Sequence, residues 1–231
     1  MNHLLFPTLI VEHTNPKHKE IKEIFFNNIM KYIDPETGFS GEATGHVNIH
    51  HETHFLDLYS FVSKCVEDYL IQLSIDVSRF DINIVKSWLN VIEKRSTPIH
   101  NHNDAHYSFV YYVNIPENAN QSIRFYNNEV HMSEPYDYMF VNNATEWNLL
   151  NSGSWSFVPE EGKCFVFPAK LRHDTHSLDG SPMEPIETNY DTVEKLYPKR
   201  IAIAGDILLT HKSITTSPTG IQPISNWKTF I

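Results

Sequence analysis

The second half of the chain has the hydrophobic period of β-strands, and this feature constrains the fold more than any other. From about Phe80 onward, short apolar and β-branched runs recur, separated by Pro, Gly and Asn. Such short strands between turn residues are typical of sandwiches and barrels. The runs that predict strands are Ile82–Ile92, Tyr107–Ile115, Ile123–Tyr126, Ser154–Val158, Lys163–Phe167 and Arg200–Leu209.

Helical patterns precede these strands. Leu5–Val11 predicts an extended segment; Asn15-Pro16 then offers an N-cap and a proline at the first helical position, and Asp34-Pro35 ends this helix. The apolar stripe from Phe55 to Leu73 predicts a second helix. Helices followed by a run of strands suggest a mainly β fold (α+β), a jelly roll with helices packed outside it. We therefore predict one domain over 1–231, with helical support at about 15–75 and a β core at about 80–210.

The amino-acid composition limits the kinds of molecule that the protein is expected to bind. The chain has 28 acidic residues against 18 Lys and Arg, a formal charge of −10, which argues against nucleic-acid and anionic-membrane binding. Cys65 and Cys164 are expected to be reduced core thiols. No stretch approaches the ~18 apolar residues of a membrane span. We expect a cytoplasmic protein whose oligomeric state the sequence leaves open, with a homodimer among the options.

The unusual feature is a histidine-rich segment, P-I-H-N-H-N-D-A-H, from Pro98 to His106. Side chains two residues apart in an extended chain project to the same face. His102 and Asp104 can therefore point at one metal ion, with His100 or His106 as a neighbour. A carboxylate beside imidazole suits iron(II), and two His plus one carboxylate leave open positions on the metal.

A third ligand must come from a strand distant in sequence. In C-F-V-F-P-A-K-L-R-H-D-T-H, a buried run ends at Pro168, and His173 and then His176 follow as candidates. Near the C-terminus, Arg200 opens an apolar strand, and its guanidinium could bind a carboxylate bidentately. The Tyr112 hydroxyl could contact the same carboxylate. Each residue also has an ordinary structural interpretation. Arg200 would then be a charged residue at the rim of the barrel, and Tyr112 an aromatic residue of the core.

Together these motifs resemble the double-stranded β-helix 2-oxoglutarate/iron(II) oxygenases, and more narrowly a 2OG-Fe(II) oxygenase group common in marine bacteria and phages. The resemblance spans nearly the whole chain. It also extends to the Y-Y-L-N strand of prolyl hydroxylases, whose second Tyr contacts the co-substrate. The matching motifs are Leu5–Thr8, Ser87-Trp88-Leu89-Asn90, His100-Asn101-His102, Ser108–Tyr112, Gly162 through Phe167-Pro168 to His173, and the strand that starts at Arg200.

The resemblance implies a double-stranded β-helix (a cupin-like jelly roll) and an oxidoreductase of the dioxygenase class, a hydroxylase. It would oxidise an unactivated C–H of a small molecule or amino-acid side chain and release succinate and CO2. The cofactors implied are Fe(II) and the co-substrate 2-oxoglutarate, with ascorbate as a stimulant. The metal ligands implied are His102, Asp104 and His173, and the co-substrate contacts are Arg200, Tyr112 and Asn90.

Two departures from the family pattern bear on the site. Phe109 replaces the family's usual Gly, and we expect it to narrow the pocket beside the iron. The gap of 27 residues from His173 to Arg200 is long for the family. Other anchors for the co-substrate are Lys170, Arg172 and Arg124, and acidic residues of the insertion (Glu184, Glu187, Asp191) could face a cationic substrate.

Two other classes of function remain open at this point. A cupin-like barrel that only binds a metal or ligand would keep the strands and histidines without needing Arg200. A zinc enzyme using metal-bound water is the second alternative. The primary substrate is not identified by the sequence. Two long polar connections stand out, 131–153 and 174–198. The first is expected to border the pocket, and the second is either a substrate lid or a solvated surface loop. The aromatic residues of the first are Tyr136, Tyr138, Phe140 and Trp147.

Overall fold

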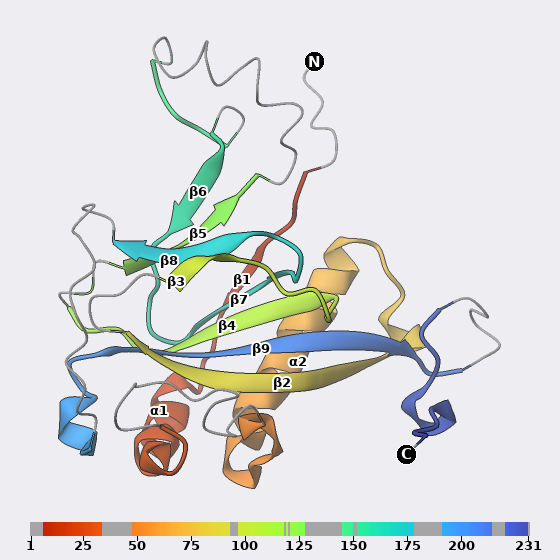
Figure 1. Ribbon diagram of the computed structural model, residues 1–231, viewed down its shortest axis with the longest axis horizontal. Coiled ribbons are helices and arrows are strands. Elements are labelled where there is room, and N and C mark those ends of the chain that lie inside the picture. Colours follow the sequence, from red (N-terminus) through yellow and green to blue (C-terminus); the bar gives the residue numbers. More distant parts are fainter. Residues whose placement is uncertain are drawn as a thin grey trace.

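Two antiparallel sheets face each other in the computed structural model (Figure 1). The larger sheet has the order β1-β7-β4-β9-β2 and the smaller one the order β3-β8-β5-β6. This confirms the predicted mainly β jelly roll. The structure describes residues 7–33, 48–92, 97–117, 119, 121–127, 145–149, 152–177, 191–213 and 220–230. The strands are β1 (Val11–Thr14), β2 (Phe80–Ile92), β3 (Thr97–His100), β4 (Tyr107–Asn114), β5 (Gln121–Tyr126), β6 (Ser154–Phe157), β7 (Lys163–Pro168), β8 (His173–Ser177) and β9 (Arg200–His211).

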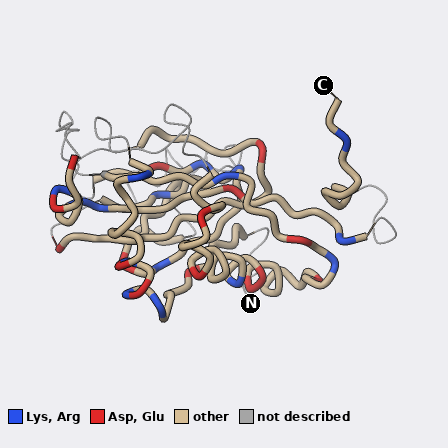
Figure 2. The backbone as a smooth tube through the Cα atoms, turned by 90° about the horizontal axis from the view of Figure 1, so that it is seen from below, with Lys and Arg blue, Asp and Glu red and all other residues tan. Residues whose placement is uncertain are grey.

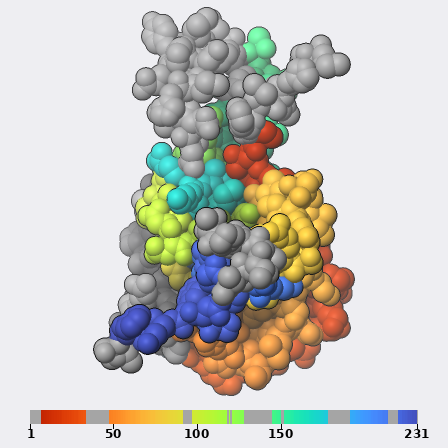
Figure 3. All heavy atoms as spheres, turned by 90° about the vertical axis from the view of Figure 1, so that its right-hand side faces the viewer, coloured from red at the N-terminus to blue at the C-terminus, as the bar shows by residue number. Residues whose placement is uncertain are grey.

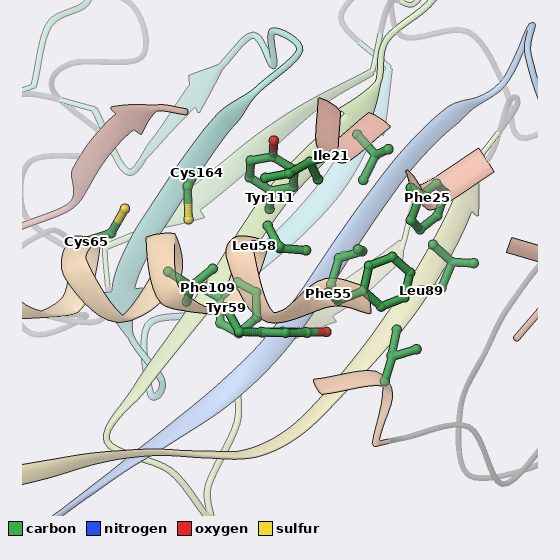
Figure 4. Packing of buried hydrophobic residues seen from close by; sticks show 14 of the residues in the cluster. Ile21, Phe25, Phe55, Leu58, Tyr59, Cys65, Leu89, Phe109, Tyr111 and Cys164 are labelled. Carbon is green, nitrogen blue, oxygen red and sulfur yellow. The ribbon is translucent and has the colours of Figure 1, made fainter. Parts of the chain in front are cut away.

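The two α-helices, α1 (His18–Phe26) and α2 (Leu56–Gln72), lie on the outer face of the larger sheet. Their apolar stripes pack on the strands beneath, as Figure 4 shows for Leu58 and Tyr59 of α2 against Phe109. Short 3-10 turns complete the helical layer and the connections: Ile29–Lys31, Ile49–His51, Thr53–Phe55, Val77–Arg79, Val193–Lys195 and Ile224–Asn226.

Both cysteines belong to this helix-covered core. Cys65 lies on α2 and Cys164 on β7, and both are buried free thiols (Figure 4). The prediction of two reduced core thiols is confirmed. Burial raises the pKa of the Cys164 thiol well above its ordinary value, so the protonated, unreactive form is favoured.

The N-terminal elements begin later than predicted. The first strand is Val11–Thr14, and Leu5 and Phe6 lie outside the described residues. Helix α1 begins at His18, because Asn15 caps the preceding turn: its Oδ1 accepts the backbone N–H of Lys17 at 2.9 Å. The helix ends at Phe26, before the 3-10 turn, whereas the sequence pattern predicts continuity to Asp34.

Charged residues are spread along the whole length of the fold (Figure 2). Residues 220–230 stand out from the body in Figures 2 and 3, and their apolar side chains are exposed, with Trp227 at 52% and Phe230 at 83%. Among the described helices, none has the length and apolar character that crossing a membrane requires.

Candidate metal centre

The two faces of the larger sheet have different neighbours: one face packs against the helices, and the other faces the smaller sheet. Along β9, Ile201, Ile203 and Ile207 belong to the helix-covered core. The alternate residue Ala202 belongs to a second apolar cluster between the two sheets. Side chains of a strand alternate between faces, so Arg200 and Asp206 share the inner face with Ala202 and Ala204. This face carries the candidate site.

Three histidines meet between the sheets. Strands β3 and β8 pair antiparallel with His100 directly opposite His173, and His102 follows two residues after the end of β3. One potential ligand atom from each histidine lies within 4.8 Å of the other two. The ring centroids are 4.4 Å apart for His100 and His173, and 5.3 Å apart for His102 and His173.

Each of the three imidazoles is fixed through the same ring nitrogen. Nδ1 of His100 donates to the Pro98 carbonyl oxygen at 2.7 Å, and Nδ1 of His173 donates to that of Leu171 at 2.8 Å. Nδ1 of His102 lies 2.5 Å from Oδ1 of Asp206. Carbonyl and carboxylate oxygens accept, so each Nδ1 carries a proton, and Nε2 is the nitrogen that the ring, in its neutral form, offers to a metal. Three histidines with Nε2 available are a suitable donor set for a transition metal.

Burial keeps the innermost histidine neutral. His173 is 7% exposed, and loss of hydration lowers its pKa to about 4, an effect that the neighbouring His100 and His102 reinforce. A neutral imidazole is the form that binds a metal ion. His173 is therefore in its ligating form at neutral pH, before any metal arrives.

Asp206 is a site residue that the sequence pattern did not predict. Its side chain is 3% exposed; Ser108 Oγ donates to Oδ1 at 2.7 Å, and Lys86 Nζ lies 3.2 Å from Oδ2. Burial alone would raise its pKa, but the bonds from His102 and Ser108 and the charge of Lys86 hold it below the usual value. The available signal was a lone acid inside the otherwise apolar run I-A-I-A-G-D-I-L-L.

The structure does not bring Asp104 to the three histidines. The extended conformation ends after His102, whose backbone N–H donates to the Ala169 carbonyl at 2.8 Å, and the chain bends at Asn103 and Asp104. Asp104 is exposed and is not a member of the histidine group. The same-face argument holds for His100 and His102 but stops at this bend.

The two other candidate histidines lie elsewhere. Nδ1 of His106 accepts the backbone N–H of Leu209 at 3.0 Å. His176 is three residues beyond His173 on β8, hence on the opposite face, where it lies 3.2 Å from Ser122 Oγ. Neither belongs to the histidine group.

The three residues predicted to bind the co-substrate are brought together by strand pairing. Asn90 of β2 and Tyr112 of β4 both lie opposite Ala202 of β9, and Arg200 Cζ lies 5.0 Å from the Tyr112 ring centroid. Arg200 is 3% exposed and Tyr112 is fully buried. Within the described part of the chain, Arg200 Nε and the Tyr112 hydroxyl are buried without a hydrogen-bond partner. Such groups are costly unless a ligand satisfies them, and a carboxylate would suit both.

The environment of Tyr112 is consistent with a site for an anion. Burial raises the pKa of the Tyr112 hydroxyl, and the positive charge and the close approach of the Arg200 guanidinium oppose this rise, although the two groups do not meet the geometry of a hydrogen bond. The hydroxyl therefore remains a proton donor. Of the other predicted anchors, Arg124 already binds Asp174 through Nη2 at 2.6 Å and Nε at 3.2 Å, and Arg172 lies 5.9 Å from the Tyr126 ring. Lys170 is exposed.

Phe109 does not narrow the site as expected. It belongs to the helix-covered cluster, on the face of β4 opposite to Ser108, and its ring lies 6.4 Å from that of Tyr59. Its partner in the pairing with β9 is Gly205, whose missing side chain makes room for the ring. The Phe that replaces Gly in this motif therefore packs on the helix-covered face of the sheet, opposite to the face that carries the candidate site.

Most of the residues predicted to border the pocket lie outside the described part of the chain. Tyr136, Tyr138, Phe140, Glu184 and Glu187 lie outside the described residues. Trp147 is 51% exposed, beside a shallow hollow that includes Trp155 of β6. Asp191 binds Lys195 Nζ at 2.6 Å.

Comparison with known proteins agrees with the fold. Residues 86–183, from β2 to beyond β8, match a family described as "Putative 2OG-Fe(II) oxygenase". No curated protein matches the chain. EctD from S. alaskensis, solved with 2-oxoglutarate and 5-hydroxyectoine, is 11% identical with a TM-score of 0.53 over 87% of this chain and 72% of that one. SnoN, a non-heme alpha-ketoglutarate-dependent epimerase from nogalamycin biosynthesis, is 8% identical with a TM-score of 0.51 over 87% and 78%.

A third structure, an oxidoreductase of the 2OG-Fe(II) oxygenase family from Burkholderia pseudomallei, is 11% identical with a TM-score of 0.34. The match covers 56% of this chain and only 46% of that protein. At such identities, structural likeness establishes the fold and not the activity. The fold is that of the double-stranded β-helix oxygenases. Residues 86–183, less than half of the chain, are similar to the 2OG-Fe(II) oxygenases.

Proposed function

We propose that the protein is an Fe(II)- and 2-oxoglutarate-dependent dioxygenase that hydroxylates an unactivated C–H bond. The observation that carries this proposal is the set of three histidines with Nδ1 occupied and Nε2 available. It lies on the same inner surface as a buried arginine without a carboxylate partner among the described residues.

The residues that would hold iron are His100, His102 and His173. His102 and His173 are the ligands that the family resemblance implies, and His100 takes the third place because β3 pairs it with His173. Asp104 as a ligand stays a prediction, and its exposed position at the bend does not favour it. Bound iron would supply dioxygen activation, coupled to conversion of 2-oxoglutarate into succinate and CO2, with one oxygen atom going to succinate and one to the substrate.

Arg200, Tyr112 and Asn90 would hold the far end of the co-substrate. The Arg200 guanidinium can donate two hydrogen bonds to one carboxylate, and the Tyr112 hydroxyl can donate a third. Between Arg200 and Asp206, the residues of β9 on the inner face are Ala202 and Ala204, whose small side chains leave space along the strand.

We further propose a small-molecule or peptidyl substrate, in the cytoplasm, without nucleic acid or membrane, in keeping with the charge of −10. Ascorbate is expected to stimulate turnover by keeping the iron reduced. The alternative is a cupin-like protein that binds a metal or ligand without oxygenase activity, and it needs no anchor at Arg200.

One experiment separates these two functions. The purified chain with Fe(II), 2-oxoglutarate and ascorbate should form succinate. Arg200→Ala should lose most 2-oxoglutarate affinity and retain iron, because Arg200 lies on β9 away from the histidines. Arg79→Ala, which alters an exposed arginine of the Val77–Arg79 turn, is the matched control. Equal 2-oxoglutarate affinity in folded Arg200→Ala and in the wild type would remove Arg200 from the site. Absence of succinate under all conditions would favour the binding protein.

A further inference from the structure

Asp206 is held more firmly than a surface carboxylate and is placed directly behind a candidate ligand. It lies in the middle of the larger sheet, opposite Lys86 of β2 and Ser108 of β4. Both of its oxygens are engaged: Oδ1 by His102 and Ser108, and Oδ2 by Lys86. It does not itself belong to the group that could coordinate a metal.

The support given to His102 differs from that given to the other two histidines. His100 and His173 each donate to a neutral carbonyl two residues earlier in their own segment. His102 lies beyond the end of β3, and its Nδ1 is bound to a charged group 104 residues away in sequence. A carboxylate on the far nitrogen fixes the ring orientation and makes the imidazole a stronger donor.

Charge gives this bond a second consequence. Three neutral imidazoles bring no negative charge to a divalent cation, whereas a carboxylate ligand would. Asp206 brings a buried negative charge to the back of His102, in surroundings where electrostatic interactions are stronger than in water. Lys86 offsets only part of this charge, because its side chain is 40% exposed and hydrated.

We propose that Asp206 is the positioning residue of the metal centre, which orients His102 and supplies from behind it the charge that a ligand carboxylate would otherwise provide. Ser108 holds the carboxylate in line with the ring. The inference rests on the proposed metal site and goes beyond it, since it states where the negative charge of a three-histidine centre comes from.

The test is a titration of the metal-free full-length chain with Co(II) alone, without co-substrate. Asp206→Asn keeps the size of the side chain and removes its charge, so it should bind Co(II) about 10- to 100-fold more weakly than the wild type. At saturation, its visible Co(II) absorption should differ from that of the wild type, because the His102 ring is no longer fixed. Asp81→Asn makes the same change at an exposed position of β2 and should behave as the wild type.

A purely structural Asp206 gives a different result: the metal-free variant melts at a lower temperature, while Co(II) affinity and absorption stay unchanged. That outcome would overturn the inference. If Asp206→Asn does not fold, Ser108→Ala serves instead, since it keeps the carboxylate and removes the hydroxyl that aligns it. About 2- to 10-fold weaker Co(II) binding is expected for this variant, and unchanged binding refutes the inference. A wild-type chain that binds no Co(II) would instead reject the proposed metal site itself.

Discussion

The two faces of the larger sheet are made by the same strands and have opposite character. On the helix-covered face, β4 presents Phe109, Tyr111 and Val113, and all three are buried among apolar side chains. On the inner face, the same strand presents Ser108 and Tyr112, which accompany Asp206 and Arg200 of β9. Because side chains alternate along a strand, one face of the sheet contributes mainly to the stability of the fold and the other carries the candidate site. Substitutions on the helix-covered face should therefore change the free energy of unfolding, and substitutions on the inner face should change ligand binding.

The largest effect is expected for Phe109→Ala on the helix-covered face. Phe109 is 1% exposed, and truncating a buried Phe costs about 3–5 kcal/mol through lost burial and the cavity that remains. Denaturant unfolding should show this loss, while the folded variant keeps wild-type Co(II) affinity. Leu73→Ala, at a residue that is 44% exposed, is the control for stability. Weak metal binding by folded Phe109→Ala would mean that the two faces are not independent.

The reverse pattern is expected for His100→Ala on the side of the metal site. Loss of a direct ligand should weaken Co(II) binding by at least about 100-fold, at or beyond the upper range for residues that only support ligands. The unfolding free energy should change little, because the His100 side chain is exposed. Asp104→Ala should keep its affinity. The opposite ranking of these two variants in the titration would restore Asp104 as the third ligand.

Gly205 tests the boundary between the faces, because it lies next to Asp206 but faces the helix-covered core. A Cβ at this position would lie 2.5 Å from Phe109 Cε1 and 2.7 Å from the Lys86 carbonyl oxygen. Gly205→Ala should therefore destabilise the fold by about 1–3 kcal/mol in denaturant unfolding. Gly153→Ala is the matched control, since a Cβ there meets nothing within 4 Å. Equal unfolding curves for the two variants would show that β9 shifts to absorb the methyl group.

The sequence predicted the apolar strands and missed the polar ones, for the same physical reason. The strands β2, β4, β7 and β9 bury one or both faces, and their apolar runs were recognised to within a few residues. By contrast, β3 reads T-P-I-H and β8 reads H-D-T-H-S, without an apolar period. Both strands carry candidate ligands. A strand that presents histidines to a metal lacks the hydrophobic pattern that identifies strands.

The site itself was predicted only in part. Arg200, Tyr112 and Asn90 were named from a resemblance, and the pairing of β2, β9 and β4 places them together. That pairing is long-range, so single motifs cannot reveal it. Asp104 was favoured by alternation, which requires an extended chain, and the chain bends there. Asp206 gave no motif, because a lone acid in an apolar strand becomes meaningful only once its partner, His102, is known.

The smallest expected effect concerns pH and His50, which lies on the helix-covered side of β2. Its backbone N–H and Nδ1 lie 3.0 and 3.1 Å from Ser87 Oγ, and burial lowers its pKa to about 4. In the unfolded chain, His titrates near pH 6.5. The unfolded state therefore binds a proton that the folded state excludes, so the contribution to stability is full above pH 6.5 and declines as the pH falls towards 4.

His50→Gln removes this titration and keeps polar groups for Ser87. Between pH 7 and pH 5, the melting temperature of the metal-free wild type should fall slightly more than that of His50→Gln. The other histidines titrate in both proteins, so any difference between the two plots of melting temperature against pH reports on His50. Parallel plots would mean that His50 is hydrated and charged in the folded state. The helix-covered face would then be more open to water at its edge than at its centre.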